Sequence, residues 1–271
     1  MIWLDNIRVE PKYAFTGETK EVDGRVVKRI KSLRAFGNVD AYCLGGFIAS
    51  EENLSHLGDC WVSKDAIVMD NAIVKGNARV TDNSIIKDNA IIRKEATIRG
   101  KSLVSNDAVV SGEAIIVDTK VLDYVHVSDN SYLENCEVTY SGDVGGRARL
   151  KNSIITDRAK LYGNIRLIDT EVAGEVLLRS CMHVINGKIS KSTDYLTIGE
   201  YGENSATITF YRTKFNDIFA YVDMGRKTFY GDLSTFKDNM TSVYSPINTP
   251  MRNSLLEIVR IHFTELPKKE S

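Results

Sequence analysis

The stretch NAIVKGNARVTDNSIIKDNAII, residues 71–92, repeats nearly the same six-residue phrase four times. In each copy an aliphatic residue follows a small residue by two places, and the copies begin at Asn71, Asn77, Asn83 and Asn89. An amphipathic helix needs apolar residues at a spacing of about 3.6, and an ordinary strand alternates over only about four to eight residues. A period of six instead indicates a short strand plus a corner, which is typical of a parallel β-helix.

The small residue of the phrase, which we call the marker, can be followed far along the chain. Markers recur every six residues from Ala66 to Ala114, so that three sides would close a triangular coil of 18 residues. From Ala114 to Met182 the steps run five, six and six, which gives a coil of 17 residues with one trimmed corner. All 21 positions that follow a marker by two places, from Val68 to Val184, carry Val, Ile or Leu. Because residues i and i+2 of a strand share a face, these columns predict the interior of about seven coils.

The residue directly before the marker is often Asn or Asp, the residue types that tolerate left-handed backbone at a tight corner. Left-handed corners are therefore predicted at Asn71, Asn77, Asn83, Asn89, Asp107, Asp118, Asn135, Asn152, Asn164 and Asp169.

The phrases DNAIVKGNARV (residues 70–80) and DRAKLYGNIRL (residues 157–167) resemble the hexapeptide-repeat, left-handed parallel β-helix family. The resemblance implies a left-handed coil, which departs from the usual right-handed crossover rule. The opening YAFTGETKEVDGRVVKRIKSLRAFGNV and the later YLTIGEYGENSATITFYRTK are most similar to uncharacterised members encoded by phages and prophages. Many members of the wider family are acyltransferases, and trimers are its usual assembly.

Three regions are expected in a mainly β chain. Residues 1–59 should form an N-terminal hairpin cap, in which Asp23-Gly24 offers a type I′ turn. Residues 60–188 should form the left-handed β-helix. Residues 189–271 should form a small C-terminal α+β domain of order β-β-β-α-α, with strands broken at Gly202 and Asn216-Asp217 and helices within 232–244 and 249–263.

Composition narrows the function classes. Lys plus Arg number 35 and Asp plus Glu 36, so no overall charge favours nucleic acid or an anionic membrane. No apolar run approaches the roughly 18 residues of a membrane span, and the start MIWLDNIRVE lacks a secretory apolar region. A cytoplasmic protein, of the host cell if phage-encoded, is expected. The four cysteines lack metal-type spacing, and the sequence has no P-loop, no GxGxxG after a strand and no HExxH motif, so neither a metal nor another cofactor is predicted.

Acyl transfer with coenzyme A or an acyl carrier is the enzymatic alternative. It needs a general-base histidine beside an acceptor slot, and the chain offers His56, His126, His183 and His262. His126 and His183 follow markers and should point outward, and an exposed surface position is expected for each histidine. No long loop interrupts the coils to build a pocket. The zinc site of a carbonic anhydrase needs three histidines, which two coil histidines 57 residues apart do not supply. No catalytic residue is predicted.

The residues that follow the markers point outward, and every third one shares a face of the rod. Two faces begin with aliphatic stripes, which predict a subunit interface, with coverage by the caps as the alternative: Ile67, Ile85 and Leu103, and Ile73, Ile91 and Val109. The resemblance makes a homotrimer the favoured assembly. The third face mixes basic and aromatic residues, the candidate ligand-binding set: Arg79, Tyr132, Arg149, Arg166 and His183.

These outward residues predict a non-enzymatic binding or interaction protein. The third face suits a small anionic, nucleotide-like or phosphorylated ligand, because arginines bind phosphate through charge-assisted hydrogen bonds. The alternative for this face is an ordinary solvated strand surface. A host protein is the other partner expected of a phage-encoded member.

Overall fold

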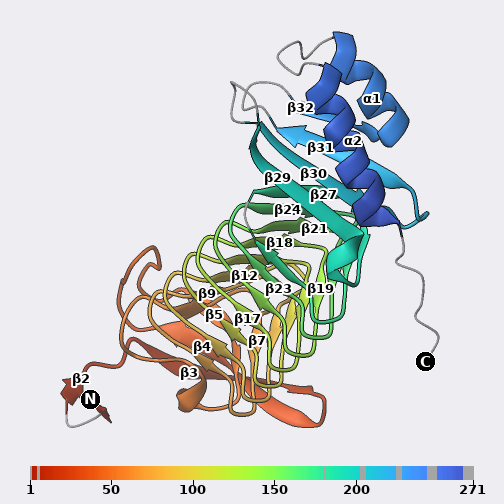
Figure 1. Cartoon of the computed structure of the whole chain (residues 1–271). Helices are drawn as coiled ribbons and strands as arrows, with labels where there is room; N and C mark the ends of the chain where they lie inside the picture. Colours follow the sequence, from red (N-terminus) through yellow and green to blue (C-terminus); the bar gives the residue numbers. More distant parts are fainter. Residues whose placement is uncertain are drawn as a thin grey trace.

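The chain folds as a parallel β-solenoid with a hairpin at one end and a small α+β domain at the other (Figure 1). The computed structural model describes residues 2–4, 7–179, 181–201, 206–223, 228–242 and 249–264. Within these residues, three-stranded coils run from β6 to β26, and β27 and β28 form a last partial coil. The predicted mainly β fold class is confirmed.

Each side of the coil stacks into its own parallel sheet, and the register matches the predicted faces. The first face contains β7 (Ile67–Val68), β10 (Ile85–Ile86), β13 (Leu103–Val104), β16 (Lys120–Val121), β19 (Glu137–Val138), β22 (Ile154–Ile155), β25 (Glu171–Val172) and β28 (Lys188–Ile189). The second contains β8 (Ile73–Val74), β11 (Ile91–Ile92), β14 (Val109–Val110), β17 (His126–Val127), β20 (Asp143–Val144), β23 (Lys160–Tyr162) and β26 (Leu177–Arg179). The third contains β6 (Trp61–Val62), β9 (Arg79–Val80), β12 (Thr97–Arg99), β15 (Ile115–Val117), β18 (Tyr132–Glu134), β21 (Arg149–Lys151), β24 (Ile165–Ile168) and β27 (Met182–Ile185).

The interior of the rod is the predicted pair of columns. The aliphatic side chains from Val68 to Val184 that follow markers by two places are at most 1% exposed. The markers from Ala66 to Ala114 are equally buried, at most 1% exposed. Each fully covered Val, Leu or Ile contributes about 1.5–3 kcal/mol relative to an exposed one. The repeated core therefore holds successive coils, and with them the outward side chains, in a fixed register.

The corners follow the prediction at trimmed sides and depart from it at six-residue sides. Asp118, Asn135, Asn152 and Asp169 have the predicted positive φ, between 48° and 52°. At six-residue sides the corner is a two-residue turn, and its first residue takes the left-handed conformation, as Asp70 does (φ 57°). The predictions one residue later were wrong: Asn71, Asn77, Asn83, Asn89, Asp107 and Asn164 lack positive φ. Several of these side chains stack along the rod instead, since the Asn71 amide donates to Asn89 (3.1 Å).

The N-terminal cap is a hairpin of β3 (Tyr13–Val22) and β4 (Arg25–Ser32), joined through Asp23 and Gly24 at φ 50° and 72°. Strand β5 (Leu44–Ile48) pairs antiparallel with β4 and parallel with β7, so coil pairing begins upstream of residue 60. The short strands β1 (Ile2–Leu4) and β2 (Ile7–Val9) pair with each other, and η1 (Glu51–Asn53) follows β5.

The C-terminal sheet closes the other end of the rod. It runs in the order β29 (Tyr195–Tyr201), β30 (Ala206–Arg212), β31 (Ile218–Asp223) and β32 (Thr228–Asp232), after the turn η2 (Ser192–Asp194). The sheet has four strands rather than the three predicted, so the order is β-β-β-β-α-α. The strand β32 was missed because a short edge strand ending in Gly231-Asp232 shows little alternation of apolar and polar residues. Helices α1 (Leu233–Ser242) and α2 (Thr249–Phe263) pack on one face through Phe236, Leu255 and Val259. Neither helix is long and apolar enough to cross a membrane.

Candidate ligand-binding face

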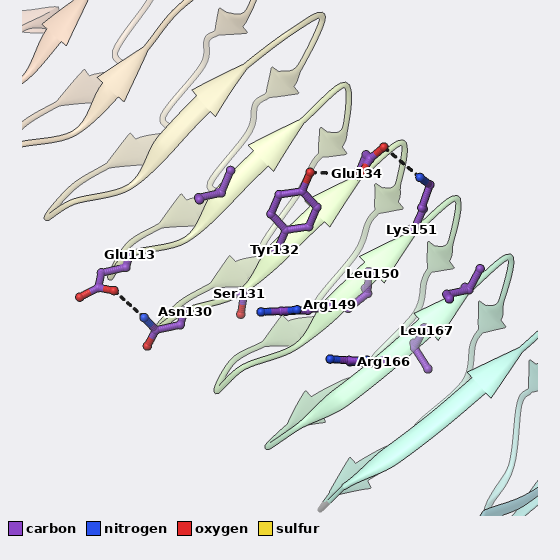
Figure 2. Close-up of a pocket in the computed structure, with 12 residues that line it drawn as sticks. Glu113, Asn130, Ser131, Tyr132, Glu134, Arg149, Leu150, Lys151, Arg166 and Leu167 are labelled. Carbon is purple, nitrogen blue, oxygen red and sulfur yellow. Dashed lines mark hydrogen bonds and ion pairs between the residues drawn. The ribbon is translucent and has the colours of Figure 1, made fainter. Parts of the chain in front are cut away.

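The third face of the rod brings four of the five predicted ligand-binding residues onto adjacent strands. Tyr132 on β18 pairs with Arg149 on β21, which pairs with Arg166 on β24, which pairs with His183 on β27. Neighbouring strands lie about 4.7–4.9 Å apart, so the four side chains form one continuous row. Figure 2 shows Tyr132, Arg149 and Arg166 rising from successive parallel strands.

Arg79 does not join this row. It lies on β9, and strands β12 and β15 separate it from β18. Its guanidinium instead lies beside Asp59 and Gly37, where an added Cβ on Gly37 would approach Arg79 Nη2 to 2.8 Å. The structure therefore places Arg79 near the N-terminal cap and apart from the other candidates.

Arg149 and Arg166 are exposed and form no ion pair or hydrogen bond within the described residues. Their neighbours on the rod do pair, as Lys151 does with Glu134 (3.3 Å) and Lys120 with Glu137 (3.3 Å). Two guanidinium groups on adjacent strands are thus left with all their donors available. Guanidinium presents a planar fork that matches phosphate or carboxylate oxygens, so this pair is suited to an anion.

The two arginines line a hollow of about 590 Å³ on the rod surface (Figure 2). The Tyr132 hydroxyl, on the same hollow, donates to Glu134 Oε2 (3.1 Å), and Lys151 offsets the Glu134 charge. The hydrogen bond holds the Tyr132 ring in place beside Arg149. The hollow thus combines a fixed aromatic ring with free cationic groups.

A second hollow, of about 450 Å³, lies where the rod meets the C-terminal sheet. The rod contributes Arg147, Arg149, Arg166, Cys181 and His183, and the sheet contributes Thr207, Tyr221, Asp223 and Thr228. Arg149 and Arg166 therefore line both hollows. A ligand larger than one phosphate group could extend from the rod face toward the sheet.

His183 is not the exposed side chain that the repeat predicted. The C-terminal sheet folds over it, and its ring lies 4.0 Å from the ring of Tyr221, measured between centroids. Its Nε2 is buried and has no hydrogen-bond partner among the residues that the structure describes. Burial, together with the nearby Arg166 charge, lowers the His183 pKa to about 4. His183 is therefore a neutral imidazole at pH 7 with an unused nitrogen at the junction.

The other histidines occupy separate environments. His56 is buried rather than exposed, because it stacks on Tyr13 with ring centroids 4.2 Å apart. His262 Nε2 lies 2.7 Å from the carbonyl oxygen of Tyr195, and His126 is exposed on the second face. Within the described residues, no three His, Cys, Asp or Glu side chains gather as a metal site would need.

The residues of the two predicted interface stripes differ in how far the N-terminal cap buries them. The N-terminal hairpin covers Ile67, which is 5% exposed and packs against Val27 and Phe47, and Ile85 lies partly buried at the edge of this cluster. The remaining stripe residues are half-buried on the rod surface: Leu103, Ile73, Ile91 and Val109. The caps thus cover part of the first stripe, and the oligomer stays a prediction.

Some residues of the site were missed by reasoning from the repeat. Arg147 and Cys181 directly precede markers, whereas the predicted ligand-binding residues all directly follow markers. The spacing Arg147-x-Arg149 could have indicated that Arg147 lies near Arg149. Tyr221 and Asp223 come from β31, and no repeat places that strand over the rod. No protein-family model matches the sequence, and no curated protein matches it significantly.

Proposed function

We propose that this protein is a non-enzymatic binding module that holds a small anionic, nucleotide-like ligand on the third face of the rod. The observation that carries the proposal is the position of Arg149 and Arg166. They occupy paired positions on adjacent strands, have no acidic partner within the described residues, and line both hollows. Like charges on adjacent strands repel each other, and an anion bound between them would offset that repulsion by attracting both.

The neighbours of the arginine pair support a nucleotide-like ligand over a bare anion. Tyr132 lies on β18, the neighbour of the Arg149 strand in the sheet, and offers an aromatic surface on which a base can stack. His183 lies one strand after Arg166, and its unpaired Nε2 can donate to a phosphate oxygen as a neutral imidazole. The row therefore presents an aromatic ring, two guanidinium groups and an imidazole, in the order that a base, sugar and phosphates would need.

The resemblance to phage-encoded proteins extends the proposal to a biological role. A phage-encoded module of this kind would sequester a nucleotide-like molecule of the host or dock on a host protein. Acyl transfer with coenzyme A stays the alternative, because coenzyme A also carries an adenine nucleotide that the row could bind. The two functions differ in whether an acyl group is transferred after binding.

Isothermal titration with ADP, ATP and acetyl-coenzyme A tests the proposal. The wild-type protein should bind at least one of these nucleotides, and Arg149→Ala with Arg166→Ala should abolish that binding. Arg158→Ala is the matched control, because Arg158 is an exposed rod arginine that pairs with Glu175 (3.1 Å) away from both hollows. No binding by the wild type, or equal binding by the folded double variant, would reject this face. Release of free coenzyme A with an acceptor amine present would favour acyl transfer.

A further inference from the structure

A second and smaller site lies on a different face of the rod. A hollow of about 130 Å³ opens on the second face, lined by Arg93, Ser111, His126, Ser128, Asp143 and Tyr162. None of these residues belongs to the third-face row. The lining combines unused hydrogen-bond donors with a restricted volume.

The hollow exists because one outward column changes size along the rod. The positions that follow the inward aliphatic residues read Arg93, Ser111, Ser128, Gly145 and Tyr162 on successive coils. Small residues thus lie between two large ones. A Cβ added at Gly145 would lie 3.1 Å from Ser128 Oγ and 3.4 Å from the Tyr162 ring, so the glycine keeps the space open.

The floor of the hollow is held in place by an ion-paired carboxylate. The Tyr162 hydroxyl donates to Asp143 Oδ2 (3.0 Å), and Lys160 Nζ lies 3.3 Å from the same oxygen. Lys160 therefore offsets the charge of Asp143, and the Tyr162 ring is fixed below Gly145. The acidic group inside the hollow is already engaged by neighbours.

Two donors on the opposite wall, Arg93 Nε and the Ser111 hydroxyl, have no partner within the described residues. Arg93 Nε is buried and makes no hydrogen bond to any residue that the structure describes. Ser111 is 5% exposed, and its hydroxyl has no partner within the described residues. The Ser128 hydroxyl donates one long hydrogen bond to Asp129 Oδ2 (3.4 Å). A buried unpaired donor is unfavourable by about 1–3 kcal/mol, and an acceptor that entered this hollow would relieve it.

We propose that this hollow binds a small oxyanion, a single phosphate or carboxylate group, between the Arg93 guanidinium and the hydroxyls of Ser111 and Ser128. A hollow of about 130 Å³ has room for one such group. The guanidinium supplies the charge, and the two hydroxyls donate to the remaining oxygens. The site is separate from the nucleotide-like site and does not depend on it.

The experiment uses Arg149→Ala with Arg166→Ala as the background, so that binding on the third face does not contribute. Inorganic phosphate and acetate are titrated in separate arms at constant ionic strength, with isothermal calorimetry as the readout. Arg93→Gln removes the charge, and Gly145→Ala fills the space without changing charge. Gly145 does not have positive φ, so alanine can adopt its backbone conformation. Arg158→Gln is the control for loss of a rod arginine.

We expect the background protein to bind phosphate or acetate, and the preferred arm identifies the group. Arg93→Gln and Gly145→Ala should each weaken that binding roughly tenfold or more, the size expected when a hydrogen bond to a charged group is lost. Arg158→Gln should leave it unchanged. No binding of either anion by the background protein would overturn the proposal, as would equal binding by both folded variants. Thermal melting of each variant establishes that it is folded.

Discussion

Tyr211 of the C-terminal sheet and Ile185 of the last coil share two hydrogen bonds. The Ile185 amide donates to the Tyr211 hydroxyl oxygen (3.1 Å), and the hydroxyl donates to the Ile185 carbonyl (3.2 Å). Tyr211 is fully buried, while its strand neighbour Phe210 faces the separate core under the helices. Alternation along β30 thus lets one strand close the rod with one face and support the small domain with the other.

Removing the Tyr211 hydroxyl should weaken this junction. Tyr211→Phe keeps the ring but leaves the Ile185 amide and carbonyl without that partner, which should lower the free energy of unfolding by about 1–3 kcal/mol. Urea unfolding measures the change. Tyr124→Phe is the control, because Tyr124 is 71% exposed and should tolerate the same substitution. Equal stability of the Tyr211 variant and the wild type would show that water replaces the hydroxyl without cost.

The phase of the repeat can be tested with two adjacent valines. Val110 is fully buried, whereas Val109 is half-buried on the second face. Val110→Asp should destabilise or unfold the protein, because an unpaired carboxylate inside the rod costs several kcal/mol. Val109→Asp should leave the monomer fold largely intact. Thermal melting compares them, and similar behaviour of the two variants would contradict the inward and outward assignment.

The rod was predictable because every coil repeats the same pattern of a small residue followed two places later by an aliphatic one. The many copies of this pattern fix its phase, so the pairing of Tyr132 with Arg149 followed from the spacing of the markers alone. The corners were harder, because the choice between Asp70 and Asn71 depends on backbone torsion that an alternating pattern does not encode. Both residues are of the type that adopts positive φ.

The surroundings of the site could not be predicted in the same way. The environment of His183 depends on β31, and the contact with Tyr221 joins residues from two regions with no common period. The burial of Ile67 similarly depends on the N-terminal hairpin folding back on the first face. Contacts between a repeat and a non-repeating cap depend on tertiary packing, and the outward residues of a strand say little about what covers them.

Association of subunits is expected through the second face. Ile73, Ile91 and Val109 form an aliphatic stripe, and each side chain would contribute about 1.5–3 kcal/mol if fully covered by another subunit. We expect a homotrimer by multi-angle light scattering at micromolar concentration, and Ile91→Lys should dissociate it. Ile154→Lys is the control, because Ile154 is exposed on the first face. A monomeric wild type would end this prediction.

His183 should make stability depend on pH. Its folded-state pKa of about 4 is below the ordinary value of 6.5, because burial and Arg166 disfavour the charged imidazole. The unfolded chain therefore binds more protons in this window, so the contribution is fully present above the unfolded pKa and is lost as pH falls toward 4. Between pH 7 and pH 5 this should reduce the free energy of unfolding by about 2 kcal/mol.

Urea unfolding of the wild type and His183→Gln at pH 7 and pH 5 separates the contribution of His183 from that of the carboxyl groups and the other histidines. The variant should lose less stability than the wild type on acidification. His126→Gln is the control for replacing a histidine of the rod, because His126 is exposed on the second face. Parallel pH profiles for wild type and the His183 variant would refute burial of a neutral imidazole at the junction.

The free arginine pair should be a small stability cost that ligand binding removes. Two charges about 5 Å apart in a water-like environment repel by roughly 1 kcal/mol, and this repulsion falls when salt shortens the screening length to about 3 Å at 1 M. Arg166→Met keeps an apolar stem and removes the charge, so it should leave stability unchanged or raise it by up to about 1 kcal/mol at low salt. The gain should shrink at high salt.

Lys120→Met, which breaks the ion pair with Glu137, is the control and should show no such gain in stability. Urea unfolding at low and high sodium chloride measures both variants. A lower stability of Arg166→Met than of the wild type at low salt would mean that Arg166 stabilises the fold in the absence of a ligand, and would contradict this prediction.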